Sequence, residues 1–271
     1  MQYYFLASLL PPLEIGHVPT LGFQEFRELM RINLTEEHWH QIGRFLRLID
    51  LENMRALWLQ EPLDPHGNAN REKLEQAILE ERWPDGEEFP AYMVDYLVRY
   101  SSVEERVAHF PLLLAQFFNE QLENQEGGQE QLHTDFFGKY FAFQREMRLV
   151  VLGFRAKKLD RDPVVELQYE DETDPLVAQI LAQKDAKTYE PPFEYRELWP
   201  IFDAYVDKPR ELHRALYEYQ FDHLVELGSA DPFSIERILN YLSRLILVER
   251  WMELTVQKGL DVINTIERNI A

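Results

Sequence analysis

Apolar residues recur three and four positions apart along most of this sequence, and two-residue alternation is hard to find over any useful length. The first spacing places apolar side chains on one side of an α-helix, whereas alternation would indicate a half-buried strand. The sequence therefore predicts an all-α fold. Hydrophobic residues make up 45% of the 271 positions, which excludes the composition of a disordered chain and allows a sizeable core.

Several expected helix ends carry capping signals. Thr35 precedes an acidic first turn, and Ser102 and Glu105 have the spacing of a capping box. A long helix is expected over residues 132–159, and the linker that follows it holds a segment with strand propensity, Val164–Leu167. Near the C-terminus, the pair Lys258–Gly259 resembles a basic last turn followed by a C′ glycine, so we expect a helix to end there.

Turn-forming residues divide the chain into three segments. Pro84–Gly86 and Pro191–Pro192 are the two strongest breaks. We therefore expect three small helical bundles, over residues 1–86, 87–190 and 191–271. A polar glutamine-rich loop is expected inside the second segment, over residues 120–131.

Each segment contains one long helix with a similar phrase. The phrases cover Asp50–Leu59, Phe143–Lys158 and Glu249–Gly259. Their recurrence indicates an internal three-fold repeat, and chance similarity between amphipathic helices is the alternative.

The charge balance limits the partners of the chain. It has 48 acidic and 28 basic residues, a formal net charge of −20, which repels nucleic-acid backbones. The absence of cysteine excludes disulfides and thiolate metal sites and favours a cytoplasmic location. The first ten residues lack the basic start of a signal peptide, and the longest nearly uncharged stretch, residues 110–119, is too short to span a bilayer.

Motifs that carry common chemistries are missing from the sequence. It contains no phosphate-binding P-loop, no Gly-x-Ser-x-Gly elbow and no His-Glu-x-x-His helix. His38 and His40 are two positions apart on an expected helix, so they point away from each other. The acidic loop Glu170–Asp174 lacks the glycine and distal glutamate of an EF-hand. We expect no enzymatic activity, no cofactor and no metal; a metal-dependent enzyme that uses the acidic loop is the less favoured alternative.

Four residues are candidates for contact with a partner. Arg155, Lys157 and Lys158 form, together with Arg161, the one dense basic patch of an acidic chain, at an expected helix end where positive charge also suits the helix dipole. Glu249 falls on the apolar stripe of its helix, so its carboxylate must be paired within the fold or lie at an interface. For all four residues, a purely structural role is the alternative.

The repeated phrases resemble the recurring long helix of the C-type connector subunit of V/A-type ATPases, whose eukaryotic counterpart is the d-type subunit. Asp50, Asn53, Met54 and Arg55 match its pattern of an acidic residue, an asparagine and an aliphatic-arginine pair; the second phrase matches in part. The opening Tyr3–Pro11 resembles a bacterial family of unknown function, known from chlamydiae and encoded in V-type ATP synthase operons. That resemblance covers essentially the whole chain.

The resemblance implies a fold and a function. The C-type connector is a non-catalytic funnel of three all-α domains that seats the central shaft on the membrane rotor ring. By analogy, we expect three bundles in a pseudo-three-fold arrangement, acting as a central-stalk connector. The expected partners are the shaft subunits and the rotor ring, and the expected location is cytoplasmic, peripheral to the inner membrane. A helical scaffold or adaptor unrelated to the ATPase is the alternative.

Overall fold

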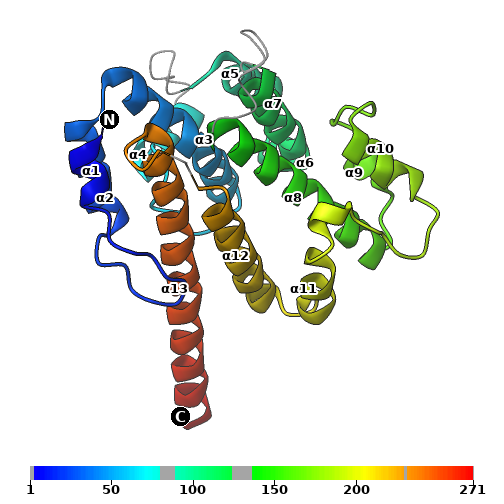
Figure 1. Cartoon of the computed structure of the whole chain (residues 1–271). Coiled ribbons are helices and arrows are strands. Elements are labelled where there is room, and N and C mark those ends of the chain that lie inside the picture. The colour runs from blue at the N-terminus through cyan, green and yellow to red at the C-terminus, as the bar shows by residue number, and fades with distance from the viewer. Residues whose placement is uncertain (1–2, 80–88, 124–135, 229–230, 271) are drawn as a thin grey trace. The chain divides into compact units, whose positions relative to one another are not determined.

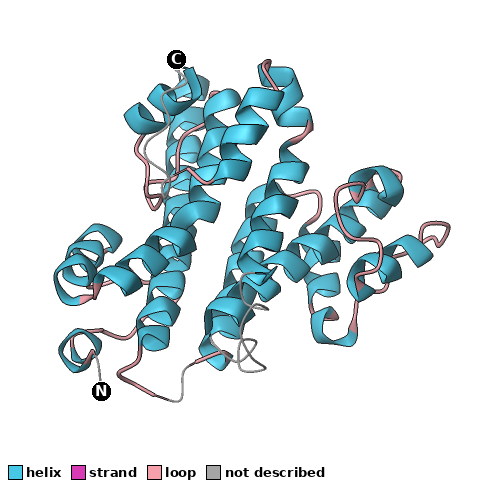
Figure 2. Cartoon of the chain, turned by 90° about the horizontal axis from the view of Figure 1, so that it is seen from above, coloured by secondary structure: helices cyan, strands magenta, loops and turns pink. Residues whose placement is uncertain are grey.

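The computed structural model describes residues 3–79, 89–123, 136–228 and 231–270, and over residues 255–270 it describes the backbone alone. Every regular element within these ranges is a helix, and no strand occurs in them (Figure 1, Figure 2). The prediction of an all-α fold is confirmed.

The helices follow one another in chain order and are labelled in Figure 1. Their bounds are α1 Tyr4–Ser8, α2 Phe23–Asn33, α3 Glu36–Trp58, α4 Arg71–Leu79, α5 Ala91–Arg99, α6 Val103–Ala108, α7 Phe110–Glu123, α8 Phe136–Lys158, α9 Pro163–Glu166, α10 Pro175–Ala182, the 3-10 helix Phe193–Tyr195, α11 Leu198–Tyr205, α12 Pro209–Glu226 and α13 Ile235–Ile270.

The chain divides into two compact units, each built from separate stretches of sequence. Unit 1 comprises residues 1–34, 146–166 and 175–271, and unit 2 comprises residues 35–145 and 167–174. Helix α8 passes from unit 2 to unit 1 between Arg145 and Glu146. The pseudo-three-fold arrangement of bundles is not confirmed, and the division at residues 86 and 190 stays a prediction.

Unit 1 is organised around the antiparallel helices α12 and α13. The Asn240 side chain on α13 donates a hydrogen bond to the Leu224 carbonyl on α12, over 2.6 Å, and further along α13 the Trp251 indole donates to Glu218. Helix α2 also packs on α13, where the ring centroids of Phe26 and Tyr241 are 5.0 Å apart. Helix α13 therefore contacts both α12, which precedes it in the chain, and α2, near the start of the sequence.

Unit 2 has an aromatic core between α3 and the first part of α8. The Phe45 ring on α3 lies 4.5 Å from the Tyr140 ring and 5.9 Å from the Phe141 ring. At the other end of α3, Arg106 is buried and donates to the carbonyls of Tyr100 and Leu97, which closes the C-terminal end of α5. Apolar packing and buried capping groups together hold this unit.

Local capping signals are confirmed. The Thr35 hydroxyl accepts a hydrogen bond from the His38 backbone N–H at the start of α3. Ser102 and Glu105 form the expected capping box before α6. Helix α10 begins at Pro175, and a proline is well suited to the first turn of a helix. The expected turn at Pro84–Gly86 lies outside the described residues, as does most of the polar loop of residues 120–131.

Two expectations about helix ends are wrong. Gly259 does not end a helix, because α13 continues through it to Ile270; an interior glycine costs a helix only about 1 kcal/mol relative to alanine, and no proline follows. The Val164–Leu167 segment is not extended, because it contributes to α9. Pro163 starts that short helix and the Asp162 carboxylate caps the Val164 N–H, so local capping outweighs β-branched propensity.

Candidate functional site

Helices α3 and α8 both end in the same turn. Gln60 and Asp160 have positive φ angles of 58° and 51°, although neither is glycine. The next N–H, of Glu61 or Arg161, donates to the carbonyl of Ala56 or Ala156 over 2.8 Å. This is the Schellman arrangement, formed twice at positions 100 residues apart.

The repeat of α3 and α8 has a different register from the one expected. The sequence phrases align residue 50 with residue 143, whereas the turns align residues 55–61 with residues 155–161. The two alignments differ by seven residues, about two helical turns. A shift of two turns keeps the apolar residues on the same helix face, so short phrases still match in the wrong register. The third phrase has no such ending, because α13 runs on through Gly259.

The connection after α3 is tied back to that helix by the side chain of Asn53. The amide of Asn53 donates to the Asp64 carbonyl over 2.9 Å and accepts from the Asp64 N–H over 2.7 Å. The Asp64 carboxylate in turn accepts from the backbone N–H of His66 and lies 2.5 Å from its buried ring nitrogen. The sequence pattern included Asn53 but not its partner Asp64.

Asp50, three residues before Asn53 on α3, is a buried carboxyl. It is 6% exposed and accepts hydrogen bonds from the Asn68 amide, over 2.7 Å, and from the Ala69 N–H, over 3.0 Å. A Cβ on Gly67 would lie 2.6 Å from Asp50 Oδ1, so the backbone approaches closely. Burial raises the pKa of Asp50 to about 6, against the weaker opposing effect of these hydrogen bonds and of Arg47.

The raised pKa of Asp50 predicts how stability depends on pH. The folded state holds the proton more tightly than the unfolded state, so this stabilisation is complete below about pH 3.8 and is lost as the pH rises through about 6. Between pH 7.0 and 4.5, the wild type should gain about 2 kcal/mol of unfolding free energy relative to Asp50→Asn. Urea unfolding of both proteins across this range measures the difference; a constant difference would contradict a raised pKa.

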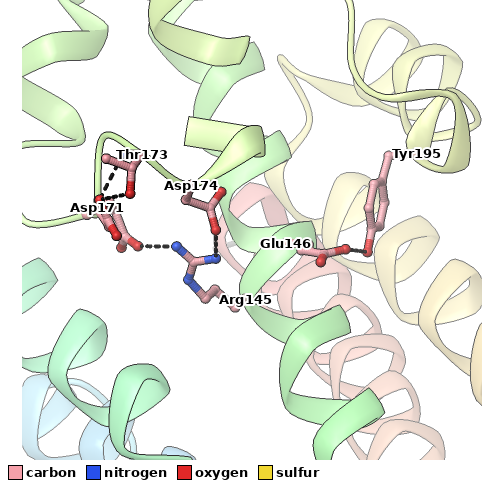
Figure 3. Close-up of polar contacts among 7 residues, drawn as sticks. Arg145, Glu146, Asp171, Thr173, Asp174 and Tyr195 are labelled. Carbon is pink, nitrogen blue, oxygen red and sulfur yellow. Dashed lines mark hydrogen bonds and ion pairs between the residues drawn. The ribbon is translucent and has the colours of Figure 1, made fainter. Parts of the chain in front are cut away.

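Two adjacent residues of α8 make separate polar contacts (Figure 3). In unit 2, the Arg145 guanidinium binds Glu170 over 3.1 Å and Asp174 over 2.8 Å, and the Arg145 and Glu170 side chains are 10% and 5% exposed. In unit 1, the Tyr195 hydroxyl donates to the Glu146 carboxylate over 2.6 Å. Burial and this carboxylate both raise the pKa of Tyr195, so its hydroxyl stays protonated and can donate.

The acidic loop therefore has a structural use. Glu170 and Asp174 hold Arg145, and Asp171 accepts from the Thr173 N–H in its own turn. Within the residues that the structure describes, no group of three or more histidine and acidic side chains is arranged to hold a metal ion. The loop lends no support to the alternative of a metal-dependent enzyme.

One residue of the basic patch at the end of α8, Lys157, makes close polar contacts inside unit 1. The Lys157 ammonium donates to the carbonyls of Gln183 and Lys184, over 2.7 and 2.6 Å, just beyond the C-terminal end of α10. Lys158 is 3.7 Å from the exposed Asp207, which is a weak pair. Arg155 is exposed, and its guanidinium has no hydrogen-bond or ion-pair partner among the described residues.

Lys157 and Lys158 offer a matched test of these assignments. Lys157→Met should lower the free energy of unfolding by about 1–2 kcal/mol, because two carbonyls lose a charged donor at a helix end. Lys158→Met should change it by less than about 0.5 kcal/mol. Urea unfolding followed by far-UV circular dichroism measures both, and equal losses would refute the capping role of Lys157.

Glu249 caps another helix. Its carboxylate accepts a hydrogen bond from the Phe23 N–H over 2.7 Å, at the start of α2, where Gly22 offers no capping side chain. A carboxylate at a helix N-terminus accepts from an N–H that has no partner inside the helix, and its negative charge complements the helix dipole. The contact joins residues 226 positions apart, which explains why the sequence predicted a constrained carboxylate but not its partner. A partner contact at Glu249, Arg155, Lys157 or Lys158 stays a prediction.

Comparison with known protein families assigns the chain to one of them. The model of a family described as "Protein of unknown function (DUF2764)" matches residues 1–270. The chain belongs to the DUF2764 family. A protein of Chlamydia muridarum is 32% identical over 270 residues, and one of Chlamydia pneumoniae is 33% identical over 270 residues; each alignment covers 99% of this chain and 98% of the relative.

These DUF2764 relatives are described as uncharacterized, so their names state no activity. Their chlamydial origin agrees with the expected bacterial family, whereas neither name mentions an ATPase. No solved structure matches the chain. In the described part of this DUF2764 protein, no helix has the length and apolar character needed to cross a bilayer.

Proposed function

We propose that this chain is a non-catalytic connector that seats the rotor shaft of a V-type ATP synthase on its membrane ring. The repetition of α3 and α8 carries the proposal. Both helices end in the same turn with a non-glycine residue at positive φ, a conformation that is uncommon for residues other than glycine. The proposed relation to the C-type connector depends on recurrence of this long helix.

The polar chemistry around the repeat also favours a mechanical role. Asn53 ties the connection after α3 to the helix, Lys157 caps α10, and Glu249 caps α2. Each group is used to hold backbone in place. A part that transmits torque needs such fixed packing, because mobile joints would dissipate the rotation.

Co-expression with the shaft subunits of the same organism tests the proposal. The complex is purified through a tag on the shaft and weighed by native mass spectrometry. We expect one copy of this chain per shaft. Recovery of the shaft alone, with the chain present and helical in the same cells, would refute the connector and leave a scaffold or adaptor unrelated to the ATPase as the better account.

A further inference from the structure

Three residues of α13 bring polar groups to one side of that helix. Arg237, Tyr241 and Arg244 are spaced four and three positions apart, so their side chains share a helix face inside unit 1. Tyr241 is 1% exposed, and both arginines are partly buried. We call these three residues the α13 cluster.

The donors of the α13 cluster are not used by the fold. The Tyr241 hydroxyl and the Arg244 Nε are buried and have no hydrogen-bond partner among the described residues. Within the same part of the chain, neither guanidinium of the cluster forms an ion pair. Arg244 lies 5.7 Å from the centroid of the Phe221 ring on α12, a contact that satisfies none of its N–H groups. Buried polar groups are nearly always hydrogen-bonded, so two such donors one turn apart are typical of a site that binds an acceptor.

The charges of the α13 cluster favour an anion as that acceptor. Burial and the charge of Arg237 both lower the pKa of Arg244, against a weaker effect of Tyr241. Burial raises the pKa of Tyr241 to about 12, so its hydroxyl stays protonated and can donate. An anion between the two guanidiniums would relieve their repulsion and accept from all three side chains.

Acidic side chains occur around the cluster without neutralising it. Glu249 accepts from the Phe23 N–H over 2.7 Å, and Glu218 on α12 accepts from the Trp251 indole over 2.9 Å. Glu236 lies next to the cluster in sequence, but consecutive helix residues face different sides. The exposed acidic residues of the adjoining α2 and α12 form no ion pair with either arginine; they are Glu25, Glu28, Asp222 and Glu226.

We propose that the α13 cluster binds a phosphate group. Each guanidinium offers paired N–H donors that match two phosphate oxygens, and the Tyr241 hydroxyl offers a further donor. A divalent phosphate balances both arginines, whereas one carboxylate balances a single arginine. The group belongs to inorganic phosphate or to a small phosphate monoester. The site goes beyond the proposed connector and stands or falls independently of it.

Isothermal titration of the full chain tests the site with three probes, which are inorganic phosphate, glycerol 3-phosphate and acetate. The titrations are run at constant ionic strength and at about pH 8, where a phosphate monoester is divalent. The variants are Arg244→Met and Tyr241→Phe, and the matched control is Arg71→Met, which removes an exposed arginine of α4. Without phosphate, both variants should be at least as stable as the wild type, because each removes a donor that the fold does not use.

We expect inorganic phosphate to bind the wild type and Arg71→Met equally, and each cluster variant at least about tenfold more weakly. Glycerol 3-phosphate that binds as tightly as inorganic phosphate supports a monoester as the ligand, and weaker binding supports the free ion. The proposal would be overturned by a wild type that binds no phosphate, by acetate that binds equally well, or by unchanged affinity in either variant. A loss of stability in the variants without phosphate would also overturn it, since the two groups would then serve the fold.

Discussion

Arg145→Met should lower the free energy of unfolding by about 3 kcal/mol, since it leaves the Glu170 carboxylate, 5% exposed, without its guanidinium partner. Arg145→Lys should lose less, because it retains the charge but not the two-pronged geometry that reaches both Glu170 and Asp174. Urea unfolding with hydrogen exchange of the α8 amides measures the global and the local effect.

An exposed arginine provides the control for Arg145. Arg71 pairs with Glu75 one turn along α4, over 3.2 Å, and both side chains are well exposed. Arg71→Met should therefore cost less than about 0.5 kcal/mol. If the Arg145 and Arg71 variants were equally stable, the buried ion pair would not contribute to holding residues 167–174.

Gly153→Ala and Gly43→Ala should have opposite effects, about 3 kcal/mol apart. A Cβ on Gly153 would lie 2.7 and 2.9 Å from two carbons of the Tyr189 ring, which is 3% exposed, so the ring must move within a packed core. We expect a net loss of about 2 kcal/mol. A Cβ on Gly43 meets nothing within 4 Å, so this change should stabilise α3 by about 1 kcal/mol through helix propensity.

Urea unfolding of both glycine variants measures this contrast. The two substitutions are chemically identical, and both lie in the interior of long helices. They differ in what the new methyl group meets. A stabilised Gly153→Ala protein would show that the Tyr189 ring does not pack against α8 as described.

Features encoded by neighbouring residues were predictable from the sequence. Thr35 caps α3 with a hydroxyl three residues from the N–H it accepts from, and Ser102 and Glu105 satisfy each other across the same span. Such signals need no knowledge of the tertiary structure. The all-helical class was predictable for a similar reason, because apolar periodicity is local.

Features encoded by distant residues were not predictable. The start of α2 has no capping side chain of its own and depends on Glu249, which lies in α13. Lys157 looked like a surface cation because its acceptors, the carbonyls of Gln183 and Lys184, carry no side-chain signal. Sequence located Lys157 and Glu249 as unusual positions, and tertiary structure supplied their partners.

The helix repeat lies between these two cases. Sequence phrases predicted recurrence of a long helix but set its register two turns away from the one that the turns at Gln60 and Asp160 define. Neither residue is glycine, so no residue type in the sequence indicates the positive φ angle that defines this turn. Gly259 is the residue type expected at such a turn, but it lies inside a helix that continues to Ile270.

ATP-driven ion transport tests the central claim most directly. The V-type ATP synthase of the same organism is assembled in lipid vesicles with and without this chain, and ATP hydrolysis and ion uptake are measured together. We expect that omitting the chain abolishes uptake while hydrolysis continues, and that adding it back restores uptake. Full coupling in vesicles that lack the chain would contradict the proposed connector role.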